Sequence, residues 1–181
     1  MQAVLASECS SRREMIDQGT QHGLAAARVA LRREFDCFEK QVRDAARCDT
    51  RARLLMSIPG LGAIVSLTFT AAIDDPARFK SSKQVGPYFG LTPTKYQSGE
   101  TDIDGRISKI GDASVRAALY EGANIILTKP LKGCTALKSW AMKIARRSGM
   151  KKAKVALARK LAVIMHRMLA DGTSFRNAAA A

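Results

Sequence analysis

The sequence has few of the residues that usually bind metals or form disulfides. Its 181 residues include two histidines and four cysteines, and no two cysteines form a Cys-x-x-Cys pair. The histidines are His22 and His166, and the cysteines are Cys9, Cys37, Cys48 and Cys134. This spacing disfavours a zinc site, and a chain of this size does not need a disulfide framework. We therefore expect reduced thiols and no metal site within the chain.

Long apolar segments are lacking as well. No run of about 18 apolar residues is present, and the N-terminus does not show the basic-then-apolar pattern of a secretory signal. We therefore expect no membrane contact and a cytoplasmic location. The apolar share of 46% is normal for a globular protein, and 181 residues can bury a real core.

Acidic residues are almost absent from the last third of the chain. The net charge is +2 over residues 1–56, zero over 57–128 and +12 over 129–181, where Asp171 is the single acidic residue. A merely soluble surface would intersperse both signs of charge. Basic residues concentrated in this way are typical of a protein that binds a polyanion, because each neutralised phosphate releases counterions. We therefore expect a nucleic-acid partner.

The apolar periodicity predicts an all-α fold. Residues 24–56 read as one long helix, which Gly19 and Gly23 separate from a shorter helical piece at 11–18. Its apolar stripe has no partner in a lone helix, so we expect a coiled-coil-like or dimeric arrangement and a homo-oligomer. The stripe runs through Leu24, Leu31, Phe35, Phe38, Val42 and Ala46. Residues 1–56 are predicted to be a helical linker or dimerisation segment.

The remaining residues predict a compact helical domain over 57–176 and a disordered tail over 177–181. Helices are expected at 63–73 and 82–89, from Asp112 or Ser114 to Lys129, around 137–145 up to Gly149, and around 157–168 up to Gly172. Between them, residues 91–105 form a long loop with no apolar period. Residues 95–96 and 102–103 can pair across it as a short hairpin. A long loop held between helices is a natural place for function.

Two glycine-containing turns have the form of phosphate-binding turns. Residues 58–62 read Ile-Pro-Gly-Leu-Gly before an apolar helix. Residues 107–116 show a similar pattern, a turn at Gly111 followed by an expected helix. Each is either an ordinary turn or a helix-hairpin-helix-like grip, in which backbone N–H groups and the helix dipole bind the DNA backbone without reading sequence. The predicted nucleic-acid-binding residues are Gly60, Gly62, Lys95, Arg106, Lys109, Gly111, Arg116, Arg146, Arg147, Lys151, Lys152 and Lys154.

Several other residues in or near the loop have competing interpretations. Ser98 precedes Gly99, and most such serines only make turns; no histidine lies nearby to activate its hydroxyl. Asp102 and Asp104 are read as solvated turn residues. The aromatic residues that flank the loop can stack on bases, although packing is the simpler interpretation: Tyr88, Phe89 and Tyr96. Core packing is also expected for Trp140, Met165 and Met168, and packing or surface exposure for His166.

An ordered series of motifs resembles a known family. The motifs are residues 58–62, 79–84, 88–93, 97–99 and 107–111, followed by 153–162. Together they resemble the C-terminal transposase domain of the DEDD-type insertion-sequence transposases. That group includes the Piv-type site-specific invertases and the bridge-RNA-guided recombinases. The resemblance covers about residues 51–176.

The resemblance implies DNA transposition by transesterification on double-stranded DNA, with a guide RNA in some members. In the family, an N-terminal RuvC-like domain holds Mg²⁺ on an acidic tetrad, and a serine forms a covalent link to DNA. Ser98 occupies the position of that serine. This chain begins inside the linking helices and has no RuvC-like strand pattern. We therefore expect a domain fragment or truncated product that binds no cofactor and is inactive alone. A non-catalytic DNA- or RNA-binding module and an assembly piece are the alternatives.

Overall fold

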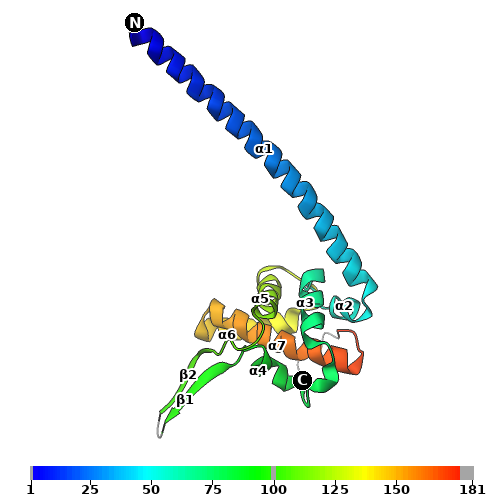
Figure 1. Cartoon of the computed structure of the whole chain (residues 1–181). Helices are drawn as coiled ribbons and strands as arrows, with labels where there is room; N and C mark the ends of the chain where they lie inside the picture. The colour runs from blue at the N-terminus through cyan, green and yellow to red at the C-terminus, as the bar shows by residue number, and fades with distance from the viewer. Residues whose placement is uncertain (1, 99–100, 176–181) are drawn as a thin grey trace. The chain divides into compact units, whose positions relative to one another are not determined.

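The computed structural model describes residues 2–98 and 101–175, and within them the side chains of 20–95 and 105–175. The described residues are mostly helical, with one small two-stranded hairpin (Figure 1). The predicted all-α fold class is therefore confirmed. The chain divides into two compact units, Met1–Val42 and Arg43–Ala181. The predicted tail at 177–181 lies outside the described residues.

Helix α1 runs without a break from Gln2 to Cys48. The predicted interruption at Gly19 and Gly23 is therefore wrong. A glycine inside a helix keeps its backbone hydrogen bonds and costs only about 1 kcal/mol relative to alanine, which neighbouring helix formers can offset. The apolar stripe is exposed within the first unit: Leu24 and Leu31 are each 71% exposed, Phe35 65% and Phe38 61%.

The helix expected to reach residue 56 ends earlier, because Asp49 starts a new one. The Asp49 carboxylate accepts hydrogen bonds from the backbone N–H groups of Arg51 (2.8 Å) and Ala52 (3.3 Å). This N-cap satisfies amides that would otherwise have no partner and begins helix α2, Thr50–Leu55. Ala52 and Leu55 are fully buried, so α2 forms part of the core of the second unit.

The core of the second unit is organised around the last helix, α7, Met150–Asp171. It packs against α2, against α4 (Val85–Tyr88), against α5 (Ala113–Thr128) and against α6 (Thr135–Ser148). Helix α3, Ala63–Ile73, packs on α2 and α5. The predicted core positions Met165 and Met168 are buried, and Trp140 is half-buried against the core.

The predicted helix ends agree with the structure at several positions. Asp112 caps α5 by accepting from the N–H groups of Ser114 and Val115, and Gly149 and Gly172 end α6 and α7. The segment expected as a helix at 82–89 is a 3₁₀ turn, Ser82–Gln84, followed by α4. A further 3₁₀ turn covers Pro76–Arg78.

The long loop expected at 91–105 is mainly an antiparallel hairpin, as its sequence allowed. Strand β1 covers Pro93–Ser98 and strand β2 covers Thr101–Ile107. Tyr96 lies opposite Ile103, and an irregularity interrupts the register between Pro93 and Lys95. Figure 1 shows the hairpin extending away from the helices of the second unit.

Candidate nucleic-acid interface

The base of the hairpin is held by two glycines that let two backbone segments touch. Gly90 and Gly111 have φ values of +65° and +87°. A Cβ atom at Gly90 would overlap the backbone of Ile110, and one at Gly111 would overlap the carbonyl oxygen of Tyr88. Only glycine accepts both the conformation and the contact. The segment after α4 and the segment before α5 are therefore fixed against each other.

Hydrogen bonds complete this junction. The N–H of Lys109 donates to the Gly90 carbonyl (3.1 Å), and the N–H of Ser108 donates to the Thr92 carbonyl (2.9 Å). The Thr94 hydroxyl donates to the carbonyl of Arg106 at 3.0 Å. The two strands therefore start from a hydrogen-bonded junction. This junction sets the position of the residues on the hairpin.

Arg116 ties the same two segments together with its side chain. Its Nη1 donates to the carbonyl oxygens of Gly111 (2.8 Å), Ile110 (3.2 Å) and Phe89 (3.3 Å). These acceptors are neutral, and within the described residues Arg116 has no acidic partner, so its positive charge stays uncompensated at the hairpin base. Gly111 and Arg116 therefore hold the hairpin base together. Their contact with nucleic acid remains a prediction.

Ser98 is the last residue of β1 and pairs with Thr101 at the end of the hairpin. Its side chain lies outside the described residues, as do those of Tyr96, Asp102 and Asp104. Lys95 and Arg106 are exposed on the described part of the hairpin, and Lys109 is exposed at its base. The hairpin therefore carries exposed cations on both of its strands and at its base.

The turn at residues 58–62 joins α2 to α3 and packs into the core. Gly60 has a φ of +93°, and a Cβ there would lie 2.6 Å from Cδ1 of Leu131. Ile58 and Leu61 are buried on either side of it. Gly62 is exposed and is the N-cap of α3, without a side-chain cap. Gly60 is thus required by packing, while phosphate binding at Gly60 and Gly62 remains a prediction.

The turn between α6 and α7 gathers four exposed cations, which we call the basic elbow: Arg146, Arg147, Lys151 and Lys152. Gly149, with a φ of +86°, connects the two helices directly. In the described part of the chain none of the four has an acidic partner. Lys151 and Lys152 also lie in the first turn of α7, where the helix dipole repels positive charge. Arg146 and Arg147 lie in the last turn of α6, where the dipole favours positive charge, so the unfavourable part of the elbow is its α7 half, which a bound anion would relieve.

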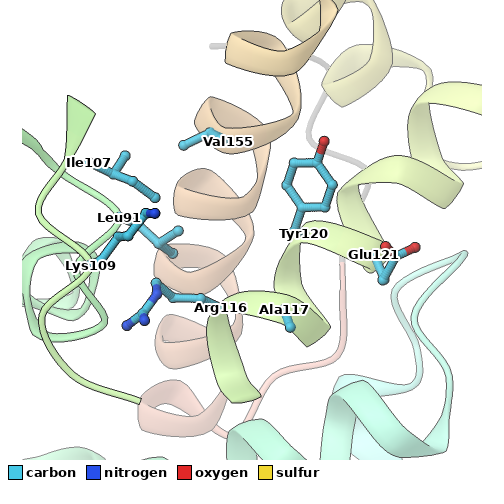
Figure 2. Close-up of a pocket in the computed structure, with 8 residues that line it drawn as sticks. All are labelled: Leu91, Ile107, Lys109, Arg116, Ala117, Tyr120, Glu121 and Val155. Atoms are coloured by element: carbon cyan, nitrogen blue, oxygen red, sulfur yellow. The ribbon is translucent and has the colours of Figure 1, made fainter. Parts of the chain in front are cut away.

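A hollow of about 460 Å³ lies between the hairpin base, α5 and α7 (Figure 2). The hairpin base supplies Leu91, Ile107 and Lys109, α5 supplies Arg116, Ala117, Tyr120 and Glu121, and α7 supplies Val155. Lys154, at the start of α7, places its ammonium 5.7 Å from the centroid of the Tyr120 ring. The sequence did not single out Gly90 as a contact residue, nor Tyr120 or Val155, because only tertiary structure brings these elements together.

Residues with competing interpretations mostly prove to be packing residues. His166 is buried; in the neutral ring its Nε2–H donates to the Pro76 carbonyl (3.1 Å) and its Nδ1 accepts from the Ser82 hydroxyl (3.0 Å). Phe89 is buried, which confirms the packing interpretation for it. Tyr88 makes ring contacts with Phe79 and Phe89 but is 43% exposed, so the structure supports the packing interpretation for it only in part.

The cysteines and acidic residues form no evident metal site within the described residues. No group of three or more His, Cys, Asp or Glu side chains there could hold a metal ion. Cys134 is buried, its thiol lies 3.5 Å from the Pro59 carbonyl, and burial raises the pKa of this thiol. The described helices also include none that is long and apolar enough to cross a membrane.

Comparison with known proteins finds one family and several relatives. Residues 52–136 match the sequence profile described as "Transposase IS116/IS110/IS902 family". The chain is 32% identical over 140 residues to the transposase for insertion sequence element IS1111A of Coxiella burnetii, which covers 77% of this chain and 38% of that protein.

Two further relatives extend this comparison. A probable family 20 transposase of Pseudomonas aeruginosa is 29% identical over 76% of this chain and 41% of its own length. The pilin gene-inverting protein of Moraxella bovis is 36% identical over 42% of this chain and 24% of its own length. The chain thus spans about two fifths of the length of the two transposases.

Proposed function

Because residues 52–136 match the profile of the IS116/IS110/IS902 transposase family, we propose that this chain is the DNA-binding, serine-bearing part of an insertion-sequence recombinase. It binds the backbone of double-stranded DNA and carries the nucleophile of strand exchange, Ser98, on its hairpin. It acts as a homo-oligomer, and a guide RNA is a further candidate partner.

The basic elbow carries the DNA-binding proposal. Four exposed cations meet where two helices join, and two of them lie at the positive end of α7. The helix dipole disfavours the two lysines of α7 in the free protein, and four clustered cations favour a bound polyanion. Contacts of this type read phosphates and not bases, so little sequence preference is expected from the elbow itself.

The hairpin supports the proposed role of Ser98. Its base is fixed by Gly90, Gly111 and Arg116, and Ser98 is the last residue of β1. Figure 1 shows the hairpin extending away from the helices of the second unit. In the proposed step a bond forms between Ser98 Oγ and phosphorus while a bond from phosphorus to a sugar oxygen breaks. The serine loses its hydroxyl proton, and the departing sugar oxygen gains one.

The described residues do not fit a resident Mg²⁺ ion, because they offer no cluster of acidic ligands. In the proposed function, Mg²⁺ is held by the acidic residues of a RuvC-like domain that works together with this chain. A non-catalytic DNA- or RNA-binding module is the second candidate, since the described binding features alone would suffice for it.

The test of the proposal is the affinity for duplex DNA as a function of salt. Wild-type chain should bind two unrelated duplexes with similar affinity and a steep dependence on salt concentration. Replacing the four elbow cations by glutamine should reduce the slope of log K against log salt by roughly 0.9 for each phosphate that the protein no longer neutralises.

A matched variant controls for net charge. Arg53, Arg78, Lys80 and Lys83 are exposed cations of the same unit that lie outside the elbow. Their replacement by glutamine removes the same charge and should leave most of the slope intact. Equal effects of the two variants, or a strong preference for one duplex, would count against backbone binding by the elbow.

A further inference from the structure

We propose that the hollow between the hairpin base, α5 and α7 binds one unpaired nucleotide, with its base against Tyr120 and its phosphate at Lys109. The inference rests on the proposed function in taking nucleic acid as the partner. It goes beyond that function because it assigns a site for a base, whereas the elbow contacts only the backbone.

The size and walls of the hollow suit a base. Its volume of about 460 Å³ lies within the range of sites for small molecules, roughly 300–1,000 Å³. Leu91, Ile107, Ala117 and Val155 give it apolar walls. The faces of a nucleobase are apolar as well, so an unstacked base would be better accommodated against these walls than in water.

Tyr120 provides the aromatic surface. Its ring is half-buried at the wall of the hollow, and the Lys154 ammonium lies 5.7 Å from the ring centroid. Figure 2 shows Tyr120 across from Leu91, Ile107 and Lys109. Sites for single-stranded nucleic acids combine an aromatic ring for the base with cations for the backbone. The hollow has both within one small region.

Lys109 is held in a conformation that side-chain-bearing residues rarely adopt. Its φ is +56°, and the close contact of Gly90 and Gly111 on either side of the junction fixes it there. Residues kept in such conformations cluster at functional sites. Within the described residues the exposed Lys109 side chain has no acidic partner, whereas Nη1 of the neighbouring Arg116 already donates to three carbonyls. Lys109 is therefore a cation at the hollow that can meet a phosphate, and the charge of Arg116 lies beside it.

Glu121 sets the orientation of the nucleotide. It lines the hollow on the Tyr120 side, and its carboxylate repels a phosphate. The phosphate is therefore expected on the opposite side, at Lys109. This arrangement places base and phosphate at different walls, as the shape of a nucleotide requires.

The test uses short single strands that differ by one base. A five-residue abasic deoxyribose strand with one central adenine is compared with the fully abasic strand by fluorescence anisotropy, together with a ribose version of each. The adenine should tighten binding by roughly 5- to 100-fold, the gain expected from stacking one base on an aromatic side chain. The deoxyribose and ribose pairs then decide whether the nucleotide comes from DNA or RNA.

Substitutions of Tyr120 and Lys109 test where the base and the phosphate bind. Tyr120→Leu should abolish the gain from adenine, while Tyr88→Leu, at an exposed tyrosine outside the hollow, should keep it.

Lys109→Gly should relieve backbone strain, raise the urea midpoint and still weaken binding of every strand. Asp74→Gly relieves a positive φ of 53° elsewhere and should raise the midpoint without weakening binding.

The outcomes separate this inference from the proposed function. Equal binding of the adenine and abasic strands overturns the hollow as a base site, and so does a gain that survives in Tyr120→Leu. A gain from adenine without duplex binding supports the hollow and overturns backbone binding of duplex DNA. Failure to bind any strand or duplex overturns both.

Discussion

Gly90 and Gly172 have nearly the same φ but very different surroundings. Their φ values are +65° and +64°, yet a Cβ at Gly90 would overlap the Ile110 backbone, while nothing lies within 4 Å of one at Gly172. Substitution at Gly172 therefore probes only the left-handed conformation. The same substitution at Gly90 also pushes apart the two backbone segments that fix the hairpin base.

We predict that Gly172→Ala lowers the free energy of unfolding by about 1–2 kcal/mol, the cost of a left-handed L-residue. Gly90→Ala should cost clearly more, because the two backbone segments must separate. Urea unfolding followed by circular dichroism measures both. Equal decreases for the two variants would mean that the two backbone segments can separate without lowering the free energy of unfolding further.

Ser66 has a buried hydroxyl without a hydrogen-bond partner within the described residues. One helical turn later, the Thr70 hydroxyl donates to the Ser66 carbonyl at 2.8 Å. An unsatisfied buried hydroxyl is unfavourable, and a satisfied one contributes about 1 kcal/mol. Ser66→Ala should therefore keep or raise the free energy of unfolding, and Thr70→Val should lower it by about 1 kcal/mol. A larger decrease for Ser66→Ala in urea unfolding would show that its hydroxyl has a partner after all.

At the scale of elements, α1 presents an apolar stripe that its own unit does not cover. Leu24, Leu31 and Phe38 are spaced by seven residues, and Phe35 and Val42 complete the same seam. A seven-residue apolar repeat along a helix is typical of a coiled coil. Exposed phenylalanines on a continuous helix favour pairing with another helix, and a second copy of this chain supplies an identical seam.

We predict that the chain forms a dimer or higher oligomer in moderate salt, which light scattering would detect. Replacing Phe35 and Phe38 by serine should shift it to monomer. Val29 is 51% exposed but lies outside the seam, so Val29→Ser should leave the assembly unchanged. A wild-type chain that stays monomeric at high concentration would contradict pairing through α1.

For the whole molecule, the proposed chemistry depends on two parts that work together. We predict that the 181-residue chain alone forms no covalent adduct with DNA. With a separately expressed RuvC-like domain and Mg²⁺ it should form one, because acidic residues can then bind the metal that activates the phosphate. A denaturing gel with labelled DNA reveals the adduct.

Substitutions on the hairpin identify the nucleophile. Ser98→Ala should abolish the adduct and leave DNA binding intact, whereas Ser108→Ala, at the hairpin base, should retain both. An adduct that persists in Ser98→Ala would make Ser98 a turn residue and place the nucleophile elsewhere.

The sequence by itself determined the features that arise from neighbouring residues. Apolar spacing predicted most of the helices, Asp112 or Ser114 marked the start of one, and Gly149 and Gly172 marked the ends of two others. The charge distribution separated a neutral middle from a basic last third. The hairpin was an open alternative in the sequence, and the structure confirms it. These features depend on contacts within a few residues, so a linear pattern can predict them.

Tertiary structure decided which residues meet across the chain. Gly60 is required because Leu131 packs against it, Gly90 because Ile110 does, and Arg116 binds carbonyls of both loops at the hairpin base. The hollow combines Ile107, Tyr120 and Val155 from three separate elements. No local pattern encodes these contacts, because each partner is selected by how the helices pack and not by its neighbours in sequence.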